Sequence, residues 1–248
     1  MKKPEMIIFD NGHTLLYEPD WNTERGNRAV FAHIVKNPNG VTVGEYAKIC
    51  SEVFGKMEDI RKTQNCDIPA RTGHKIIDDL LNIEFSLAPT EREIVFWTAA
   101  SSGAVMPYAD RMLDRLNENG IRTAVISNLA WSGEALTERL DRLLPNNKFE
   151  FVITSSDYMY RKPSRVLFDI ALNKAGLAAD KVWYCGNSIT ADIEGAHGAG
   201  IFPVLYEGET PGDINPYSGQ NDGIKVDFEY LHIHDWRELI DVLEKIPR

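Results

Sequence analysis

The stretch IIFDNGHTLL, residues 7–16, is where the interpretation of the whole chain starts. Ile7, Ile8 and Phe9 form a continuous apolar run, which is typical of a strand buried on both faces of a parallel sheet. Asp10 follows at the carboxyl end of this predicted strand, where ligands bind in open α/β sheets. The sequence therefore puts a carboxylate in a position suited to chemistry.

The composition indicates an acidic globular protein. Its 248 residues are 43% hydrophobic, which is enough for one large or two modest domains. The net charge of -10 argues against nucleic acid or an anionic membrane surface as the main partner. Cys50, Cys66 and Cys185 show no CxxC or zinc-type spacing, so we expect a reduced, cytoplasmic compartment. We expect neither a signal peptide nor a transmembrane helix, and the oligomeric state cannot be read from the sequence.

Helix and strand signals alternate from residue 105 onward. Predicted helices near 110–119, 133–144, 164–175 and 190–199 each lead into a strand: RTAVIS, FEFVITS, KVWYCG and FPVLY. This alternation indicates βαβ units and a parallel sheet. A long loop is expected over 207–224, where Gly, Pro, Asn and Asp are frequent, and a closing helix in DWRELIDVLEKI.

Residues 17–103 lack strong strand signals and show helical patterns instead. Helices are predicted near 21–35, 43–60, 76–83 and 90–98, the last opened by a capping box of Thr90 and Glu93. We therefore expect the α/β class, with a Rossmann-like parallel sheet core of residues 1–16 and 104–248. Residues 17–103 would form an inserted all-helical domain, hinged near 16–18 and 102–105.

Polar residues follow the predicted strands or open the next helices: Asp10, Ser127, Asn128, Lys162, Asn187 and Asp192. Since the carboxyl ends of parallel strands meet at one edge, we expect these residues to share one crevice. Their chemistry suits phosphoryl transfer, because a carboxylate can attack phosphorus and a lysine can balance the negative charge. Hydroxyl and N–H groups can hold phosphoryl oxygens, and Mg²⁺ prefers hard oxygen ligands.

In this order, the four segments resemble the motifs of the haloacid dehalogenase superfamily. FDNGHTLL resembles the D-x-D-G-T opening, VISN the second motif and RKP the third, and GNSITADIEGAHGAG resembles G-D-S-x-x-x-D-x-x-G-A-x-x-A-G. The resemblance spans nearly the whole chain and is to the branch whose helical cap is inserted after the first strand. It implies that 17–103 is the cap and that the protein is a hydrolase, most often a phosphatase.

The resemblance also implies a role for each matching residue. Asp10 would be the nucleophile and Lys162 its catalytic partner. The Ser127 hydroxyl, the amide that follows it at Asn128, and Lys162 would bind the phosphate. The implied Mg²⁺ ligands are Asp10, the backbone carbonyl of Gly12, Asn187 and Asp192.

The sequence departs from the family pattern at three positions. Gly12 replaces the aspartate that protonates the leaving group and then activates water, help that is typically worth about 10²–10⁴ in rate. Asn187 replaces another aspartate and removes one negative charge, so weaker metal affinity is expected. His13 replaces a glycine, and because histidine titrates near neutral pH it could act as a substitute acid or base. If the segment is extended, its side chain points away from that of its neighbour.

Three functions are compatible with the sequence. The first is a slow Mg²⁺-dependent phosphohydrolase that acts on a small phosphorylated metabolite through an aspartyl-phosphate. The second is a phosphonate- or halide-cleaving hydrolase. The halide enzymes carry an aromatic residue in place of Gly12, whereas the phosphonate enzymes carry a small one and use a cap lysine, for which the candidates are Lys36, Lys48, Lys56, Lys62 and Lys75. The third is a catalytically impaired protein that binds a phosphate ligand or a partner.

Overall fold

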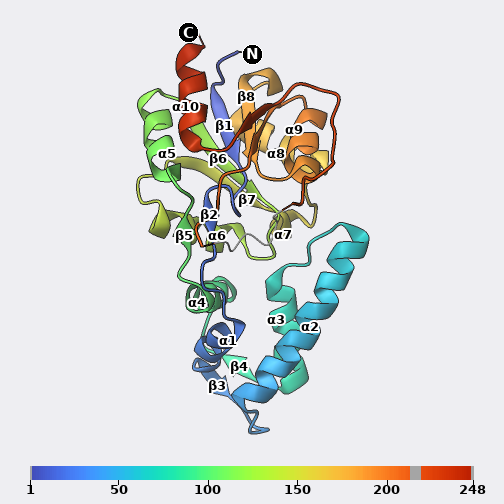
Figure 1. Cartoon of the computed structure of the whole chain (residues 1–248). Coiled ribbons are helices and arrows are strands. Elements are labelled where there is room, and N and C mark those ends of the chain that lie inside the picture. Colours follow the sequence, from blue (N-terminus) through green and yellow to red (C-terminus); the bar gives the residue numbers. More distant parts are fainter. Residues whose placement is uncertain (1, 213–218, 247–248) are drawn as a thin grey trace.

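A six-stranded parallel sheet forms the centre of the computed structural model, which describes residues 2–212 and 219–246 (Figure 1). Its spatial order is β10 (Leu231–Ile233), β9 (Phe202–Tyr206), β8 (Val182–Gly186), β1 (Met6–Phe9), β6 (Arg122–Ser127) and β7 (Phe149–Thr154). All neighbouring strands in it are parallel, so the predicted sheet is confirmed. The chain passes from β1 to β6 and β7 and then returns to β8. The topological switch point therefore lies between β1 and β8.

Helices cover both faces of this sheet because alternate side chains of each strand point to opposite sides. Ile7 and Phe9 pack in one apolar cluster, and Met6 and Ile8 in another. The first cluster includes residues of α5 (Ala109–Glu118), α6 (Gly133–Leu143) and α10 (Trp236–Lys245), and the second includes residues of α8 (Arg165–Ala175) and α9 (Glu194–Gly198). Two short elements, α7 (Ser155–Tyr158) and η1 (Ala179–Lys181), complete this part.

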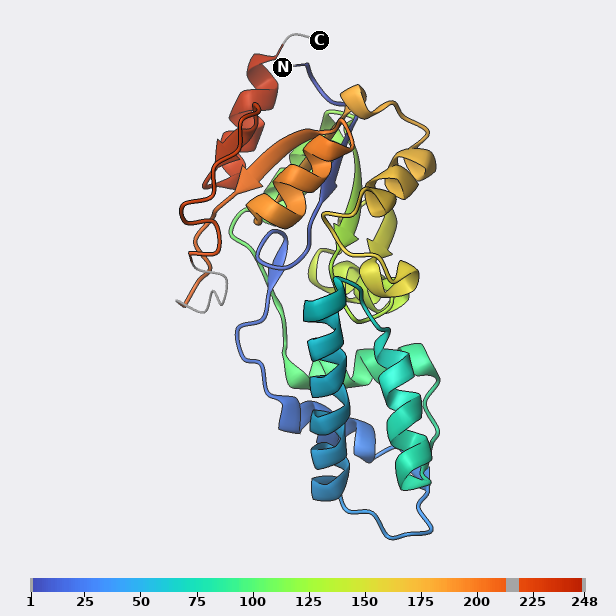
Figure 2. The same ribbon diagram turned by 90° about the vertical axis from the view of Figure 1, so that its right-hand side faces the viewer.

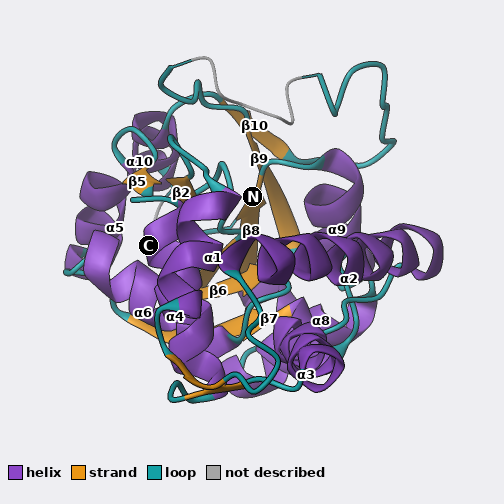
Figure 3. Ribbon diagram, turned by 90° about the horizontal axis from the view of Figure 1, so that it is seen from below, coloured by secondary structure: helices purple, strands orange, loops and turns teal. Residues whose placement is uncertain are grey.

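Residues 17–103 lie at the carboxyl edge of the sheet and contribute no strand to it (Figures 1 and 3). Their helices are α1 (Thr23–Phe31), α2 (Val43–Gln64), α3 (Ala70–Leu81) and α4 (Pro89–Ala100). They share their own apolar cluster, which includes Val30, Tyr46 and Ile77. The segment also holds a small two-stranded sheet of β3 (Ile34–Lys36) and β4 (Glu84–Phe85), which the helical pattern did not predict. We call residues 17–103 the helical insertion.

The capping box predicted at the start of α4 is wrong. Pro89 occupies the first turn, and the Ala88 N–H donates to the Glu91 side chain instead. Proline suits this position because its fixed φ is helical and its missing N–H would have had no helical partner. Glu93 is thereby left for another contact. Its carboxylate accepts hydrogen bonds from the N–H and hydroxyl of Ser132, at 2.9 and 2.5 Å, across the boundary with the sheet domain.

The chain enters and leaves the helical insertion through a two-stranded ribbon. β2 (Leu16–Tyr17) pairs antiparallel with β5 (Ala104–Val105) close to both expected hinges. A second attachment comes from the loop between α2 and α3, where Asp67 accepts two hydrogen bonds from Arg161 at 2.7 and 2.6 Å and one from Ser155. The insertion is therefore held to the sheet domain by buried polar contacts as well as by its two connections.

Other differences from the sequence prediction are local. The helix expected near 190–199 begins as a π-helical turn, η2 (Ile189–Ile193). β10 was not predicted. Residues 207–212 and 219–224 form no helix or strand, as expected for a loop, and residues 213–218 of that prediction lie outside the described residues. Among the helices described, none is both long and apolar enough to cross a membrane.

Candidate active site

A cleft of about 770 Å³ lies between the carboxyl edge of the sheet and the helical insertion. Every residue singled out from the sequence lines it: Asp10, Gly12, Ser127, Asn128, Lys162, Asn187 and Asp192. The cleft also touches the carboxyl-terminal part of α2, which Figure 2 shows reaching from the far end of the insertion to the sheet domain. The structure thus brings residues from four strand ends and from the insertion to one place, beside the topological switch point.

A buried ion-pair network fixes Lys162 at the base of this cleft. Its ammonium donates to Asp10 Oδ1 and to Asp192 Oδ1, both at 2.6 Å. The Tyr184 hydroxyl lies 2.8 Å away and the Ile126 carbonyl 3.2 Å away. Only 3% of the Lys162 surface is exposed. The lysine therefore cannot leave Asp10 without losing bonds that water would have to replace.

The protonation of this network follows from burial and charge. Burial raises the pKa of Asp10 to about 6, against the lowering effect of Lys162, and the Asp192 charge adds to the rise. Burial opposes the charge of Lys162, but the two carboxylates outweigh it and raise its pKa. Burial raises the pKa of Tyr184 well above its ordinary value, with a further contribution from Asp192. At neutral pH, Asp10 is mostly ionised beside a charged lysine and a protonated tyrosine.

Gly186, the last residue of β8, makes room for Asp192. A Cβ at this glycine would lie 2.3 Å from Asp192 Cγ, so no other residue fits without a shift. The π-helical turn supports the same arrangement, because the N–H groups of Asp192 and Ile193 both donate to the Ser188 carbonyl, at 2.9 and 3.2 Å. Asp192 Oδ2 accepts the Ser188 N–H at 3.0 Å. The backbone thus aims this carboxylate at Lys162.

The end of β6 supplies two neighbouring residues with different surroundings. Within residues 2–212 and 219–246, the Ser127 hydroxyl has no hydrogen-bond partner, although the residue is only 4% exposed. In its neighbour Asn128, both the oxygen and the nitrogen of the side-chain amide have hydrogen-bond partners. Asn128 Oδ1 accepts the Lys162 N–H at 2.8 Å, and its Nδ2 donates to the Lys162 carbonyl at 3.1 Å. Ser127 is therefore available for a ligand, whereas the Asn128 side chain positions the backbone of the lysine.

The residues expected to hold a metal also line this cleft. In the described part of the chain, the Asn187 side chain has no partner, and its backbone carbonyl accepts from Gln220 and Asn221, each at 2.9 Å. An amide oxygen, the Gly12 carbonyl and the Asp10 carboxylate make an all-oxygen set, which fits Mg²⁺. Asp192 is less available to a metal than these groups, since its two oxygens already accept hydrogen bonds from Lys162 and from the Ser188 N–H.

The first motif bends sharply after Asp10. His13 has a left-handed φ of 54°, and the N–H groups of Thr14, Leu15 and Leu16 all point to the Asn11 carbonyl. The extended segment assumed for His13 in the sequence analysis is therefore wrong. Its side chain lines the cleft, and its Nδ1 lies 3.0 Å from the Thr210 hydroxyl. Burial lowers the pKa of His13, so the neutral ring is favoured at neutral pH.

Two residues of the site were not found from the sequence. Tyr184 sits in a strand that reads as apolar throughout, yet its buried hydroxyl contacts Lys162. The Thr14 hydroxyl donates to Asp10 Oδ2 at 3.3 Å. The available signal was a tyrosine inside a strand buried on both faces, because a buried hydroxyl needs a partner.

The comparisons with known proteins agree with this geometry. The model of the haloacid dehalogenase-like hydrolase family matches residues 95–205. This part of the chain, which is less than half of its length, is similar to that family. The matched range contains Ser127, Lys162 and Asp192, whereas Asp10 lies before it. The similarity to this family therefore rests on the second, third and fourth motifs, and the structure places Asp10 of the first motif in the same cleft.

Individual relatives cover the chain to different extents. The ribulose-1,5-bisphosphate 5-phosphatase of Halopiger xanaduensis is 28% identical over 113 residues, which are 45% of this chain and 46% of that protein. The chain thus spans about half the length of the curated relatives it matches first. Over 99% of both chains, a 2-haloacid dehalogenase structure from Pseudomonas syringae pv. Tomato DC3000 has a TM-score of 0.59 at 19% identity. A HAD phosphatase structure from Thermococcus onnurineus gives 0.56 at 19% identity over 98% of both chains. The same fold therefore occurs in a dehalogenase and in a phosphatase, so the reaction must be argued from the site.

Proposed function

We propose that this protein is a Mg²⁺-dependent phosphohydrolase that cleaves a small phosphorylated metabolite through an aspartyl-phosphate on Asp10. The observation that carries the proposal is the bond from buried Lys162 to Asp10, in a cleft that also contains the Ser127 hydroxyl. The phosphatase among the relatives supports the same reaction class. The three cysteines are free, which supports a reducing, cytoplasmic location.

The proposed reaction has two steps on one carboxylate. An oxygen of Asp10 attacks phosphorus, the bond from phosphorus to the ester oxygen breaks, and the alcohol leaves with a proton taken from solvent. Water then attacks the same phosphorus and breaks its bond to Asp10, which releases inorganic phosphate and a proton. Lys162 balances the negative charge in both steps, and the Ser127 hydroxyl donates to a phosphoryl oxygen.

The metal would be held in the cleft beside Asp10. The Asp10 carboxylate, the Gly12 carbonyl, the Asn187 amide oxygen and the Asp192 carboxylate would be its ligands, although both Asp192 oxygens already accept hydrogen bonds. When bound, Mg²⁺ adds positive charge next to the transferred phosphoryl group. Asn187 contributes no charge, so we expect weaker binding than a site with one more carboxylate would give.

The rate should be modest because Gly12 provides no acid. A Cβ at Gly12 would meet no atom of the described residues within 4 Å. The space that an acidic side chain would occupy is therefore open. The first step then depends on how readily the leaving oxygen departs without a proton donor. The second step has no carboxylate to activate water, so phosphoenzyme should accumulate.

We also propose that the helical insertion is a cap over this site, with boundaries at the β2–β5 ribbon. Its helix α2 brings Glu58, Arg61 and Lys62 to the cleft, and Asn65 follows directly after the helix. Polar and basic side chains there suit a small anionic substrate and would select among substrates. A cap that covers the cleft would also exclude water during the first step.

A phosphonate-cleaving reaction is the second candidate, because Lys62 is the one cap lysine among the five candidates that lines the cleft. A lysine forms a Schiff base when it is desolvated or placed beside another cation. The Lys62 side chain is instead 70% exposed and lies 3.6 Å from Glu58. These surroundings favour phosphate ester hydrolysis over the Schiff-base route.

The proposal is tested by measuring product release from three substrate classes. Purified protein is incubated with a panel of small phosphate esters, with a phosphonate and with a 2-haloacid, each in MgCl₂ or in EDTA. We expect phosphate release from esters in MgCl₂ and little in EDTA. Cleavage of the phosphonate or the haloacid alone would contradict the proposal, and so would binding of esters without any turnover.

A further inference from the structure

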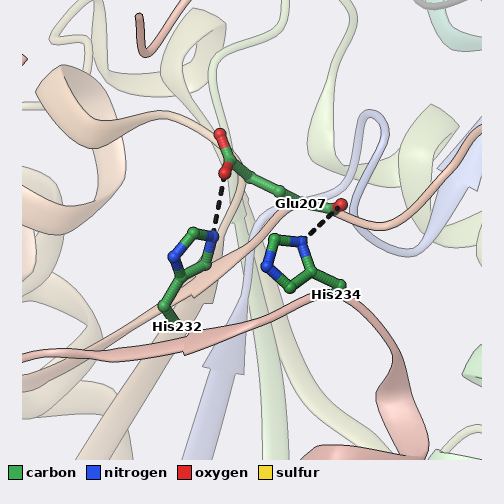
Figure 4. Close-up of side chains that lie close together, drawn as sticks. All are labelled: Glu207, His232 and His234. Atoms are coloured by element: carbon green, nitrogen blue, oxygen red, sulfur yellow. Dashed lines mark hydrogen bonds and ion pairs between the residues drawn. The ribbon is translucent and has the colours of Figure 1, made fainter. Parts of the chain in front are cut away.

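Three side chains of the kind that bind transition metals gather outside the cleft, at the ends of β9 and β10 (Figure 4). Glu207 follows β9 directly, His232 lies in β10, and His234 comes one residue after β10. The two histidines share one face of the strand because they are two residues apart. One ligand atom from each of the three residues lies within 4.8 Å of the others.

Existing hydrogen bonds already orient this group. His232 Nε2 lies 2.8 Å from Glu207 Oε2, and His234 Nδ1 lies 3.3 Å from the Glu207 backbone carbonyl. A ring nitrogen that faces a carbonyl carries the proton, which leaves the lone pair of His234 on Nε2. Metal-binding histidines usually donate their other ring N–H to such a carbonyl or carboxylate. In Figure 4, the second ring nitrogen of His234 is turned toward His232.

The carboxylate has a second support. Asn221 Nδ2 donates to Glu207 Oε1 at 2.7 Å and to the Asn187 carbonyl at 2.9 Å. Asn221 Oδ1 accepts the Ile189 N–H at 2.8 Å. One oxygen of Glu207 is thereby held by Asn221, while the other faces the histidines. Asn221 therefore links the cluster to the loop that carries Asn187, but none of the three cluster residues lines the cleft.

We propose that Glu207, His232 and His234 bind one transition-metal ion of the zinc class. Two imidazoles and one carboxylate suit zinc, whereas Mg²⁺ prefers oxygen ligands alone. Three protein ligands leave a fourth position for water, as in other three-ligand zinc sites. All three residues are exposed, so an ion from solvent reaches them directly.

Binding requires small adjustments. Tetrahedral zinc with imidazole ligands places ligand atoms roughly 3.4 Å apart. The three atoms here lie within 4.8 Å, and exposed side chains can close that difference by rotation. The ion replaces the hydrogen bond between His232 and Glu207. The proton leaves His232 Nε2 and the ring takes one up on Nδ1 through solvent, so His232 binds the ion as a neutral imidazole. It would then tie the end of β9 to β10, the edge strand of the sheet.

The test measures zinc binding to the full chain in excess MgCl₂, which competes for the all-oxygen site in the cleft. Calorimetric titration with ZnCl₂ should give about one zinc per chain, and zinc should raise the Tm, because an ion that binds only the folded state stabilises it. The double variant His232→Gln/His234→Gln should lose both effects. The matched control is His33→Gln, an exposed histidine of the helical insertion, which should retain them.

Two further variants test the arrangement of the ligands. Glu207→Gln should weaken zinc binding, and Asn221→Ala should weaken it by about tenfold, the usual effect of losing a group that orients a ligand. Absence of zinc binding, or binding and Tm shifts that persist in the double variant, would overturn the proposal. None of these readouts depends on catalysis, so the outcome is independent of the function proposed for the cleft.

Discussion

The two sides of the cleft differ in how many contacts their residues make. On one side, Lys162 contacts four oxygen atoms, from Asp10, Asp192, Tyr184 and Ile126. On the other side, a Cβ at Gly12 would meet no described atom within 4 Å. The groups proposed to stabilise charge lie in the interior of the protein, whereas position 12, where the proposal lacks a proton donor, borders open space. An acid could therefore be absent from this site without disturbing the fold or Asp10, the proposed nucleophile.

The largest effect is expected from removing Asp10, the proposed nucleophile, which is bonded to Lys162. Asp10→Asn keeps the size of the side chain but replaces the attacking oxygen by an amide, so phosphate release should fall to background. Mass spectrometry should find one added phosphoryl group on the wild type during turnover and none on the variant. The control is Asp180→Asn at an exposed position, which should change neither readout. Activity retained in Asp10→Asn would show that the bonded side is not where the reaction occurs.

Removing the cation tests how much that side depends on its buried network. Lys162→Met leaves Asp10 and Asp192 buried together without compensation, which should destabilise the protein by about 3–5 kcal/mol. Urea unfolding measures this loss, and phosphate release should fall sharply as well. The matched variant Lys181→Met removes an exposed lysine paired with Glu5 at 2.7 Å, which should change stability little because solvent screens the pair. Equal losses of stability in the two variants would mean that the buried network contributes no more than an exposed ion pair.

A smaller effect is expected from changing Asn187, one of the proposed ligands of the metal. Asn187→Asp adds a carboxylate to the proposed ligand set and should tighten Mg²⁺ binding by about tenfold, from the added opposite charge. Calorimetric titration with MgCl₂ measures the change. Asn65→Asp is the control, because it adds the same charge to the cleft from the helical insertion. The same gain in both variants, or none in Asn187→Asp, would show that residue 187 is not a ligand.

The convergence of the site could be predicted from the sequence because parallel strands impose it. Once β1, β6 and β8 are recognised as buried strands, Asp10, Ser127 and Asn187 lie at their carboxyl ends and must meet at one edge. The helices around them end at glycines in the left-handed region, such as Gly120 and Gly176, which local sequence also reveals. Local signals were therefore sufficient for the order and direction of these elements.

Contacts between distant segments could not be predicted in this way. The bond from Arg161 to Asp67 joins residues 94 positions apart, and no local pattern marks either one. Glu93 looked like a capping residue because its helical spacing from Thr90 was right, but tertiary contact with Ser132 uses it instead. β10 was missed because three residues, with a histidine in the middle, give too short a pattern.

The contrast between the two sides of the cleft is tested most directly by restoring the acid. Gly12→Asp and its matched control Gly12→Asn are compared with the wild type through kcat/KM for an alkyl phosphate and for an aryl phosphate. General acid catalysis is typically worth about 10²–10⁴ in rate. Alkyl leaving oxygens need a proton, whereas aryl leaving oxygens need little help.

The account predicts that Gly12→Asp raises kcat/KM for the alkyl phosphate by about tenfold or more, even if the new acid is imperfectly placed. The aryl phosphate should change little, and Gly12→Asn should improve neither substrate. Equal gains on both substrates, or a gain in Gly12→Asn that matches Gly12→Asp, would contradict the claim that this site has kept its nucleophile and lost only its proton donor.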